Sequence, residues 1–150
     1  MAQFELSVEL DFAAAHQIPG HPGKCARMHG HNYRVVVQVA GDELNELGML
    51  VDFGDVRKVC QGVIGELDHR TLNELPAFAS VPPTSEHIAR HIYRAIGEAM
   101  AGGRGQAPAQ RGESRSFAPL REAQDENRRS VRVSAVTVYE SPRSAVTYRG

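Results

Sequence analysis

A strict alternation of apolar and polar side chains near the start of the chain constrains the fold more than any other feature. Over residues 3–12 the chain reads QFELSVELDF, with a period of two. Its apolar positions are Phe4, Leu6, Val8, Leu10 and Phe12. Side chains of a β-strand point alternately to opposite faces of a sheet, so this run predicts a strand with one buried face. A second alternating run, about residues 29–40, follows a Pro- and Gly-rich loop over 17–28, and the two runs predict a hairpin.

The middle of the chain carries two helical patterns. Apolar residues recur at helical spacing over 53–67, and Asp52 or Asp55 is expected at or near the start of this helix. A second helix follows Thr84, its predicted N-cap, with Glu86 in the first turn, where the helix dipole favours an acid.

Strand patterns return near the end of the chain, at 131–140 and 144–149. The order strand, strand, helix, helix, strand, strand predicts an α+β fold, in which two helices cover one face of an antiparallel sheet. Because open sheet edges favour aggregation, we expect an oligomer that joins sheets edge to edge into a barrel.

Composition narrows the class of protein. With 150 residues the chain is expected to form one domain, interrupted by a low-complexity insertion at about 101–130 that holds few apolar residues. Its 17 basic and 18 acidic residues give a net charge of −1, which argues against a nucleic-acid-binding protein. No apolar run approaches the roughly 20 residues that cross a membrane, and no signal peptide is visible. Two cysteines are too few for a disulfide framework, so a reducing compartment, the cytoplasm, is expected.

Three histidines form the strongest chemical signal. His29 and His31 lie two residues apart in a predicted strand, so both side chains point to one face. His16 ends the preceding strand, and the hairpin brings it beside them. Three neutral imidazoles match a catalytic zinc site with one open position. Cys25 has two readings, because it is either a fourth ligand that closes a structural site or a free thiol beside the metal.

Two weaker signals lie further along the chain. Asp68 precedes His69, and a carboxylate can orient an imidazole if the fold brings the two side chains together. Glu140 ends a predicted strand, either as an exposed residue or as a buried anchor for a guanidine-like edge of a ligand. Sequence alone leaves both interpretations open.

Six motifs, in this order, resemble the 6-pyruvoyl-tetrahydropterin synthase family, and more closely its bacterial 6-carboxytetrahydropterin synthase branch. They read FAAAH, C-x-x-x-HGHNY, MLVDFGDV, LDHRTLN, PTSEHIA and YES. The resemblance covers nearly the whole chain outside 101–130. It implies a tunnelling fold, in which ββααββ protomers form barrels, usually as a hexamer of two stacked trimers.

The resemblance also implies a role for each candidate residue. One Zn²⁺ per subunit binds the three histidines, and Cys25 acts with Asp68 and His69, the last two supplied across a subunit boundary. The residues implied at the pterin end of the pocket are Glu140, Glu86, Thr84 and Ser85. Because Lys24 and Arg27 lie beside Cys25 in the sequence, we expect both to contact the triphosphate. The family more often has Asn where this chain has His87, which leaves Glu86 in place.

The reaction that the bacterial branch implies is a lyase reaction. It converts 7,8-dihydroneopterin triphosphate to 6-carboxy-5,6,7,8-tetrahydropterin, acetaldehyde and triphosphate, on the route to queuosine and other 7-deazapurines. The alternatives are a 6-pyruvoyl-tetrahydropterin synthase, which eliminates triphosphate without losing acetaldehyde, and a non-catalytic module with a structural zinc.

Overall fold

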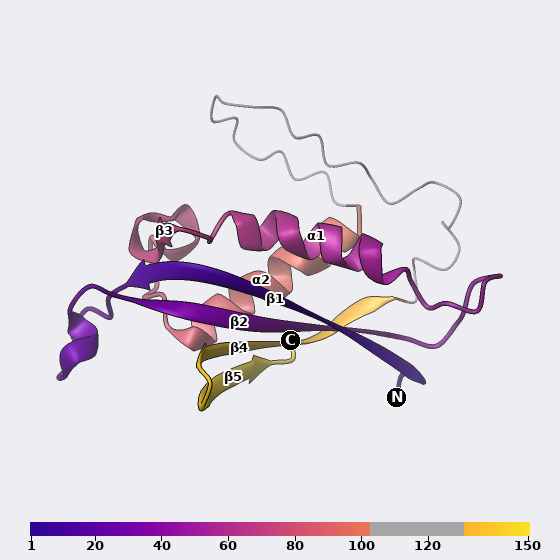
Figure 1. Cartoon of the computed structure of the whole chain (residues 1–150), viewed down its shortest axis with the longest axis horizontal. Helices are drawn as coiled ribbons and strands as arrows, with labels where there is room; N and C mark the ends of the chain where they lie inside the picture. The colour runs from indigo at the N-terminus through magenta and orange to yellow at the C-terminus, as the bar shows by residue number, and fades with distance from the viewer. Residues whose placement is uncertain (103–130) are drawn as a thin grey trace, which may run out of the picture.

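The computed structural model describes residues 1–102 and 131–150, and its centre is a five-stranded sheet (Figure 1). The strands follow the order β3-β1-β2-β4-β5. Their bounds are β1 Phe4–His16, β2 His29–Gly41, β3 Arg70–Thr71, β4 Arg132–Ser141 and β5 Ser144–Tyr148. All neighbouring pairs are antiparallel except β1 with β3. The four predicted strands and the α+β class are therefore confirmed, whereas the insertion predicted at about 101–130 lies, from residue 103 on, outside the described residues.

The β1–β2 hairpin is the longest ladder of the sheet, running from the pair Phe4↔Gly41 to the pair His16↔His29. The alternation predicted for 3–12 continues to His16, so β1 is longer than the pattern indicated. Its buried side chains, including Val8 and Phe12, face the helices, and its polar side chains face away. The strand end at His16 therefore lies directly beside the start of β2.

β3 is the one strand of the described residues that the sequence did not predict. It pairs parallel with Ala14 and Ala15 at the end of β1. Two residues are too few to show an alternation, so no pattern marks them. The chain is fixed here by Leu72, which is fully buried in the short 3₁₀ helix η2 (Leu72–Glu74) directly after β3.

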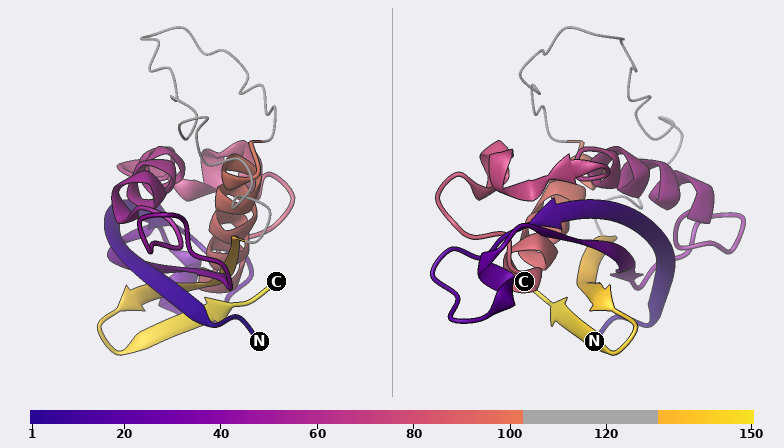
Figure 2. Two further views of the ribbon diagram at one scale, coloured as in Figure 1. Left: turned by 90° about the vertical axis from the view of Figure 1, so that its right-hand side faces the viewer. Right: turned by 60° about the vertical axis from the view of Figure 1, so that its left-hand side comes forward.

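Both helices lie on the same face of the sheet (Figure 2). α1 (Phe53–Gly65) packs on β1, and α2 (Ser85–Met100) packs on β4, on β5 and on α1. Asp52 caps α1 by accepting from the backbone N–H groups of residues 54 and 55, and Thr84 caps α2 by accepting from the N–H of His87. Such caps contribute about 1 kcal/mol each. The remaining 3₁₀ helices are η1 (Lys24–Ala26) and η3 (Pro76–Phe78).

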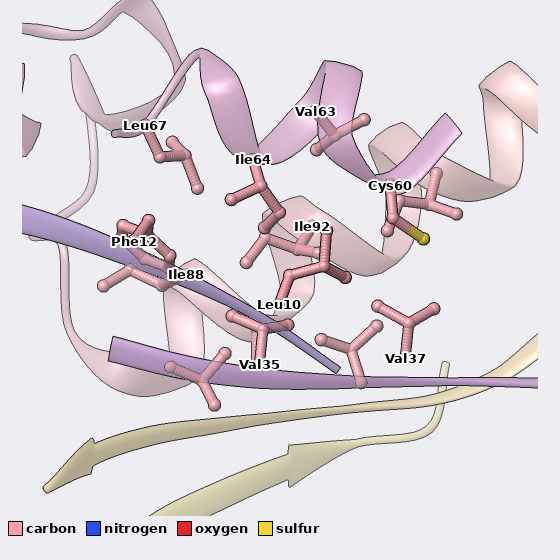
Figure 3. Packing of buried hydrophobic residues seen from close by; sticks show 14 of the residues in the cluster. Leu10, Phe12, Val35, Val37, Cys60, Val63, Ile64, Leu67, Ile88 and Ile92 are labelled. Atoms are coloured by element: carbon pink, nitrogen blue, oxygen red, sulfur yellow. The ribbon is translucent and has the colours of Figure 1, made fainter. Parts of the chain in front are cut away.

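Aliphatic side chains from the sheet and both helices interdigitate to form the core (Figure 3). Val35 and Val37 of β2 and Ile92 of α2 have no exposed surface. Cys60 is buried among them, and burial raises the pKa of its thiol to about 12, which fits a packing role. Phe53 departs from its predicted place on the apolar stripe of α1, because it begins the helix and is 58% exposed.

None of the helices within the described ranges is long and apolar enough to cross a membrane.

The core predicts a large difference between two substitutions of similar size. Ile92→Ala removes a side chain with no exposed surface and is expected to lower the free energy of unfolding by about 2–5 kcal/mol. Leu47→Ala is the matched control, because Leu47 is 77% exposed and its loss should change that energy by no more than about 0.5 kcal/mol. Urea denaturation followed by circular dichroism measures both. Equal effects would contradict the placement of Ile92 in the core.

Candidate metal centre and adjoining cleft

Three histidine side chains converge where β1 ends and β2 begins. The strand register places His16 opposite His29, and His31 follows two residues later. Their ring centroids are 4.6 to 5.2 Å apart, all in edge-to-face arrangements. One donor nitrogen from each ring lies within 4.8 Å of the other two. The hairpin therefore assembles the three-histidine cluster that the sequence predicted.

Backbone carbonyl groups orient two of these imidazole rings. His16 Nδ1 lies 2.8 Å from the carbonyl oxygen of Pro83, and His29 Nδ1 lies 2.7 Å from that of Arg27. A carbonyl oxygen only accepts, so in each pair Nδ1 carries the proton. Nε2 of each ring is then unprotonated, and in His16 it lies 3.4 Å from the Tyr33 hydroxyl oxygen. A hydrogen bond from one ring nitrogen to a backbone carbonyl oxygen, with the other nitrogen unprotonated, is typical of histidines that bind metal ions.

His31 completes the set with a buried nitrogen that has no hydrogen-bond partner. Within the described part of the chain, its Nε2 is the one buried side-chain nitrogen or oxygen in that condition, although Glu140 Oε1 lies 3.4 Å away. Burial lowers the pKa of His31, while the Glu140 carboxylate opposes this shift. The neutral ring is thus favoured near pH 7, and a neutral ring is what a metal ion needs. The cluster fits a metal ion that takes nitrogen ligands.

A cleft of about 400 Å³ adjoins the cluster, and His16 and His29 form part of its wall. Cys25, in η1, also lines it and is half-buried. The backbone N–H of Ile18 donates to the Cys25 carbonyl oxygen at 2.8 Å and so joins the two ends of the loop between β1 and β2. Among the described residues, the cluster of possible metal ligands comprises the three histidines without Cys25.

Acidic and hydroxyl side chains line another part of the same cleft. Ser85 Oγ donates to Glu140 Oε2 at 2.9 Å, so the start of α2 fixes a carboxylate from the end of β4. Thr84 and Glu86 also line the cleft, and Glu86 is exposed. The four residues that the resemblance placed together, Thr84, Ser85, Glu86 and Glu140, therefore line one cleft with His16 and His29. A pocket edge of this kind accepts hydrogen bonds from a ligand that presents N–H groups.

Asp68 and His69 contact each other but lie outside this cleft. His69 Nδ1 is 2.9 Å from Asp68 Oδ1, and the same oxygen accepts the backbone N–H of Ala13 at 2.9 Å. This backbone hydrogen bond and the contact with His69 lower the pKa of Asp68. The His69 side chain is 82% exposed and its backbone has a φ of 57°, a conformation rare outside glycine. His69 lines a second cavity of about 450 Å³, beside β3 and the ends of β1 and β2.

The remaining predicted residues, Lys24 and Arg27, are exposed, and among the residues described they line neither of these two cavities. Arg27 contributes its carbonyl to the cluster instead of its guanidinium. The roles of this carbonyl and of the Pro83 carbonyl could not be predicted from the sequence, because every residue has a backbone carbonyl and its identity does not show where that group points. No role for His21 was evident from the sequence either, although His21 lines the cleft.

Known proteins resemble this chain in amino-acid sequence and in fold. The model of the family described as 6-pyruvoyl tetrahydropterin synthase matches residues 5–111. The chain is 39% identical over 93 residues to a putative 6-carboxy-5,6,7,8-tetrahydropterin synthase of Archaeoglobus fulgidus, covering 62% of this chain and 76% of that one. It is 42% identical over 95 residues to the 6-carboxy-5,6,7,8-tetrahydropterin synthase of Bacillus subtilis, covering 60% of this chain and 63% of the relative.

Solved structures agree on the fold. The 6-pyruvoyl tetrahydropterin synthase of Caenorhabditis elegans superposes with a TM-score of 0.68 at 22% identity, covering 100% of this chain and 99% of that one. The Plasmodium falciparum protein of the same name gives a TM-score of 0.65 at 18% identity, with 100% and 99% covered. The tunnelling fold expected from the motifs is thus confirmed. Together with the match over residues 5–111, it shows that the chain belongs to the 6-pyruvoyl tetrahydropterin synthase family.

Proposed function

We propose that this chain is a zinc-dependent lyase that converts 7,8-dihydroneopterin triphosphate and one water molecule to 6-carboxy-5,6,7,8-tetrahydropterin, acetaldehyde and triphosphate, in the biosynthesis of queuosine and other 7-deazapurines. The observation that carries the proposal is the three-histidine cluster, two members of which, His16 and His29, line a cleft together with Cys25 and Glu140. The relatives named 6-carboxy-5,6,7,8-tetrahydropterin synthase support this choice of reaction.

One zinc ion per chain is held by His16, His29 and His31. When bound, it supplies a Lewis acid that acidifies the hydroxyl groups of the substrate side chain. Neutral imidazole ligands suit this task because they do not reduce the positive charge of the ion. The full charge then acts on the hydroxyl groups of the substrate. The carbonyls of Pro83 and Arg27 hold the rings in the tautomer that presents Nε2.

Two groups move protons. Cys25 Sγ, in the cleft wall, accepts a proton from the substrate side chain as a thiolate, and Nε2 of His69 exchanges a proton on the opposite face. Asp68 keeps His69 in position through the contact of 2.9 Å at Nδ1. A pair of proton carriers on opposite faces lets hydrogen move between neighbouring carbon atoms without release of an intermediate.

The pterin is bound at the acidic part of the cleft. Glu140 accepts hydrogen bonds from the amino-pyrimidine edge, which presents N–H donors, and Ser85 fixes the carboxylate by donating to Oε2. Thr84 and Glu86 complete this part of the pocket. Lys24 and Arg27, whose exposed side chains flank Cys25 in the sequence, contact the triphosphate.

The active site is completed by a second copy of the chain. His69 is 82% exposed and lines a different cavity from Cys25, so one protomer does not bring the two groups together. We therefore infer a homo-oligomer, a hexamer of two trimers, in which Asp68 and His69 of one chain face the cleft of a neighbour.

We also infer that the protein works in the cytoplasm. Both of its cysteines are free thiols, as expected in a reducing compartment.

A 6-pyruvoyl-tetrahydropterin synthase is the second candidate, because the family model and the C. elegans structure carry that name. The two reactions use the same substrate and the same residue types. A structural-zinc module is less well supported, since Cys25 lies outside the histidine cluster of the described residues.

Product analysis separates the two reactions. Incubation of the zinc-loaded protein with 7,8-dihydroneopterin triphosphate is expected to yield 6-carboxy-5,6,7,8-tetrahydropterin and acetaldehyde, because the proposed reaction breaks the carbon–carbon bond of the side chain. Mass spectrometry identifies the pterin, and derivatisation with a hydrazine detects acetaldehyde. A pyruvoyl pterin without acetaldehyde would establish the second candidate instead.

Metal content tests the roles of Cys25 and His31. Cys25→Ala is expected to keep its zinc and to lose at least about 100-fold in kcat, because the thiol moves a proton and binds no metal. His31→Ala should lose both zinc and turnover, since it removes a ligand. Atomic absorption after gel filtration measures the zinc. Loss of zinc from Cys25→Ala would point to a closed structural site.

Mixing two inactive variants tests the shared active site. Cys25→Ala and His69→Ala are each expected to be inactive alone. Mixed oligomers formed by unfolding and refolding the two together should recover activity, to about a quarter of the wild-type value, because about a quarter of the sites draw both intact residues from different chains. Refolded single variants are the controls. No recovery in oligomers shown to be mixed would contradict the shared site.

A further inference from the structure

Near His16, the edge of β1 that faces away from β2 is hydrogen-bonded to one short segment, residues 68–71. The backbone N–H of His69 donates to the Ala13 carbonyl oxygen, and Asp68 Oδ1 accepts the Ala13 N–H. β3 then pairs with Ala14 and Ala15. The chain turns into η2 directly after β3, so its backbone leaves the edge of β1 before reaching Gln17.

The side chain of Asn73 occupies the place that the backbone has left. Its Oδ1 accepts the backbone N–H of Gln17 at 2.9 Å, and its Nδ2 donates to the Gln17 carbonyl oxygen at 2.9 Å. A carboxamide carries the same donor and acceptor as a peptide group, so Asn73 adds one more rung to the β1–β3 ladder. Both hydrogen bonds are partly buried and join residues 56 positions apart in the chain.

This rung lies next to a metal ligand of the proposed site. His16 directly precedes Gln17 and pairs with His29 on its other edge. His16 is 1% exposed, and its Nδ1 lies 2.8 Å from the Pro83 carbonyl oxygen, which orients the ring. A strand end normally frays, because its last peptide groups lack partners. Because of Asn73, both the backbone N–H and the carbonyl group of Gln17, the residue after His16, are hydrogen-bonded.

We propose that Asn73 is a positioning residue, which fixes the end of β1 so that His16 meets the metal ion in register with His29 and His31. The proposal rests on the proposed function only in taking His16 as a metal ligand. Asn73 itself makes no contact with the substrate. Its effect is on the affinity of the cluster for the metal, because a mobile His16 must be ordered each time the ion binds.

The test compares zinc affinities in the absence of substrate, by competition with a chromophoric chelator. Asn73→Ala removes both hydrogen bonds and is expected to weaken zinc binding by at least about tenfold, as changes around metal ligands commonly do. Asn73→Asp keeps the acceptor but places an oxygen opposite the Gln17 carbonyl, so it should weaken binding as well. Circular dichroism establishes that each variant is folded, and Asn73→Asp serves if Asn73→Ala is not.

Asn45→Ala is the matched control. Asn45 Oδ1 also accepts two backbone N–H groups, those of Leu47 at 2.9 Å and Met49 at 3.0 Å, in the loop between β2 and α1. Zinc affinity should be unchanged in this variant. Saturating zinc should also restore turnover to Asn73→Ala, but not to His31→Ala.

Two results would overturn the inference alone. They are wild-type zinc affinity in folded Asn73→Ala or Asn73→Asp, and an equal loss of affinity in Asn45→Ala. A wild-type chain that binds no zinc would overturn the proposed function, and the inference with it. Turnover to an unexpected product would refute only the proposed reaction.

Discussion

The pairing of β1 with β2 in one register is the constraint on which the rest of the structure depends. It places His16 opposite His29 and buries the apolar face of β1 under the helices. A slip of one residue would turn every side chain of β1 to the other face of the sheet. Because Val8, Leu10 and Phe12 would then meet water, the hydrophobic core enforces the same register that assembles the histidine cluster. The site is thus a consequence of how the core is packed.

Sequence periodicity predicted the parts of the fold that repeat. The long alternation of β1, the helical spacing of α1 and the cap at Thr84 are local patterns, and the structure confirms them. β3 escaped prediction because two residues carry no period, and Phe53 was misplaced because the first residue of a helix need not follow its apolar stripe. Motifs such as LDHRTLN pointed to the candidate residues, but not to their arrangement in space.

The arrangement of the site depends on groups that residue types do not reveal. The tautomers of His16 and His29 are set by backbone carbonyls, whose positions follow from the loop before α2 and from η1. The contact between Ser85 and Glu140 joins residues 55 positions apart, on elements that only the packing of α2 against β4 brings together. Long-range contacts of this kind have no periodic signature, so the sequence could name candidate residues for the site but could not predict its geometry.

The carboxylate of Asp68 serves two unrelated purposes with one atom. Oδ1 accepts the N–H of Ala13 at the edge of the sheet and also lies 2.9 Å from the imidazole of His69. A substitution that removes this oxygen therefore loses the contact with His69 and also loosens the edge of β1. In the proposed reaction, selection for activity and selection for folding would act on the same oxygen, so neither could adjust it independently. At this position a loss of fitness in a mutational scan would not reveal by itself which of the two properties had failed.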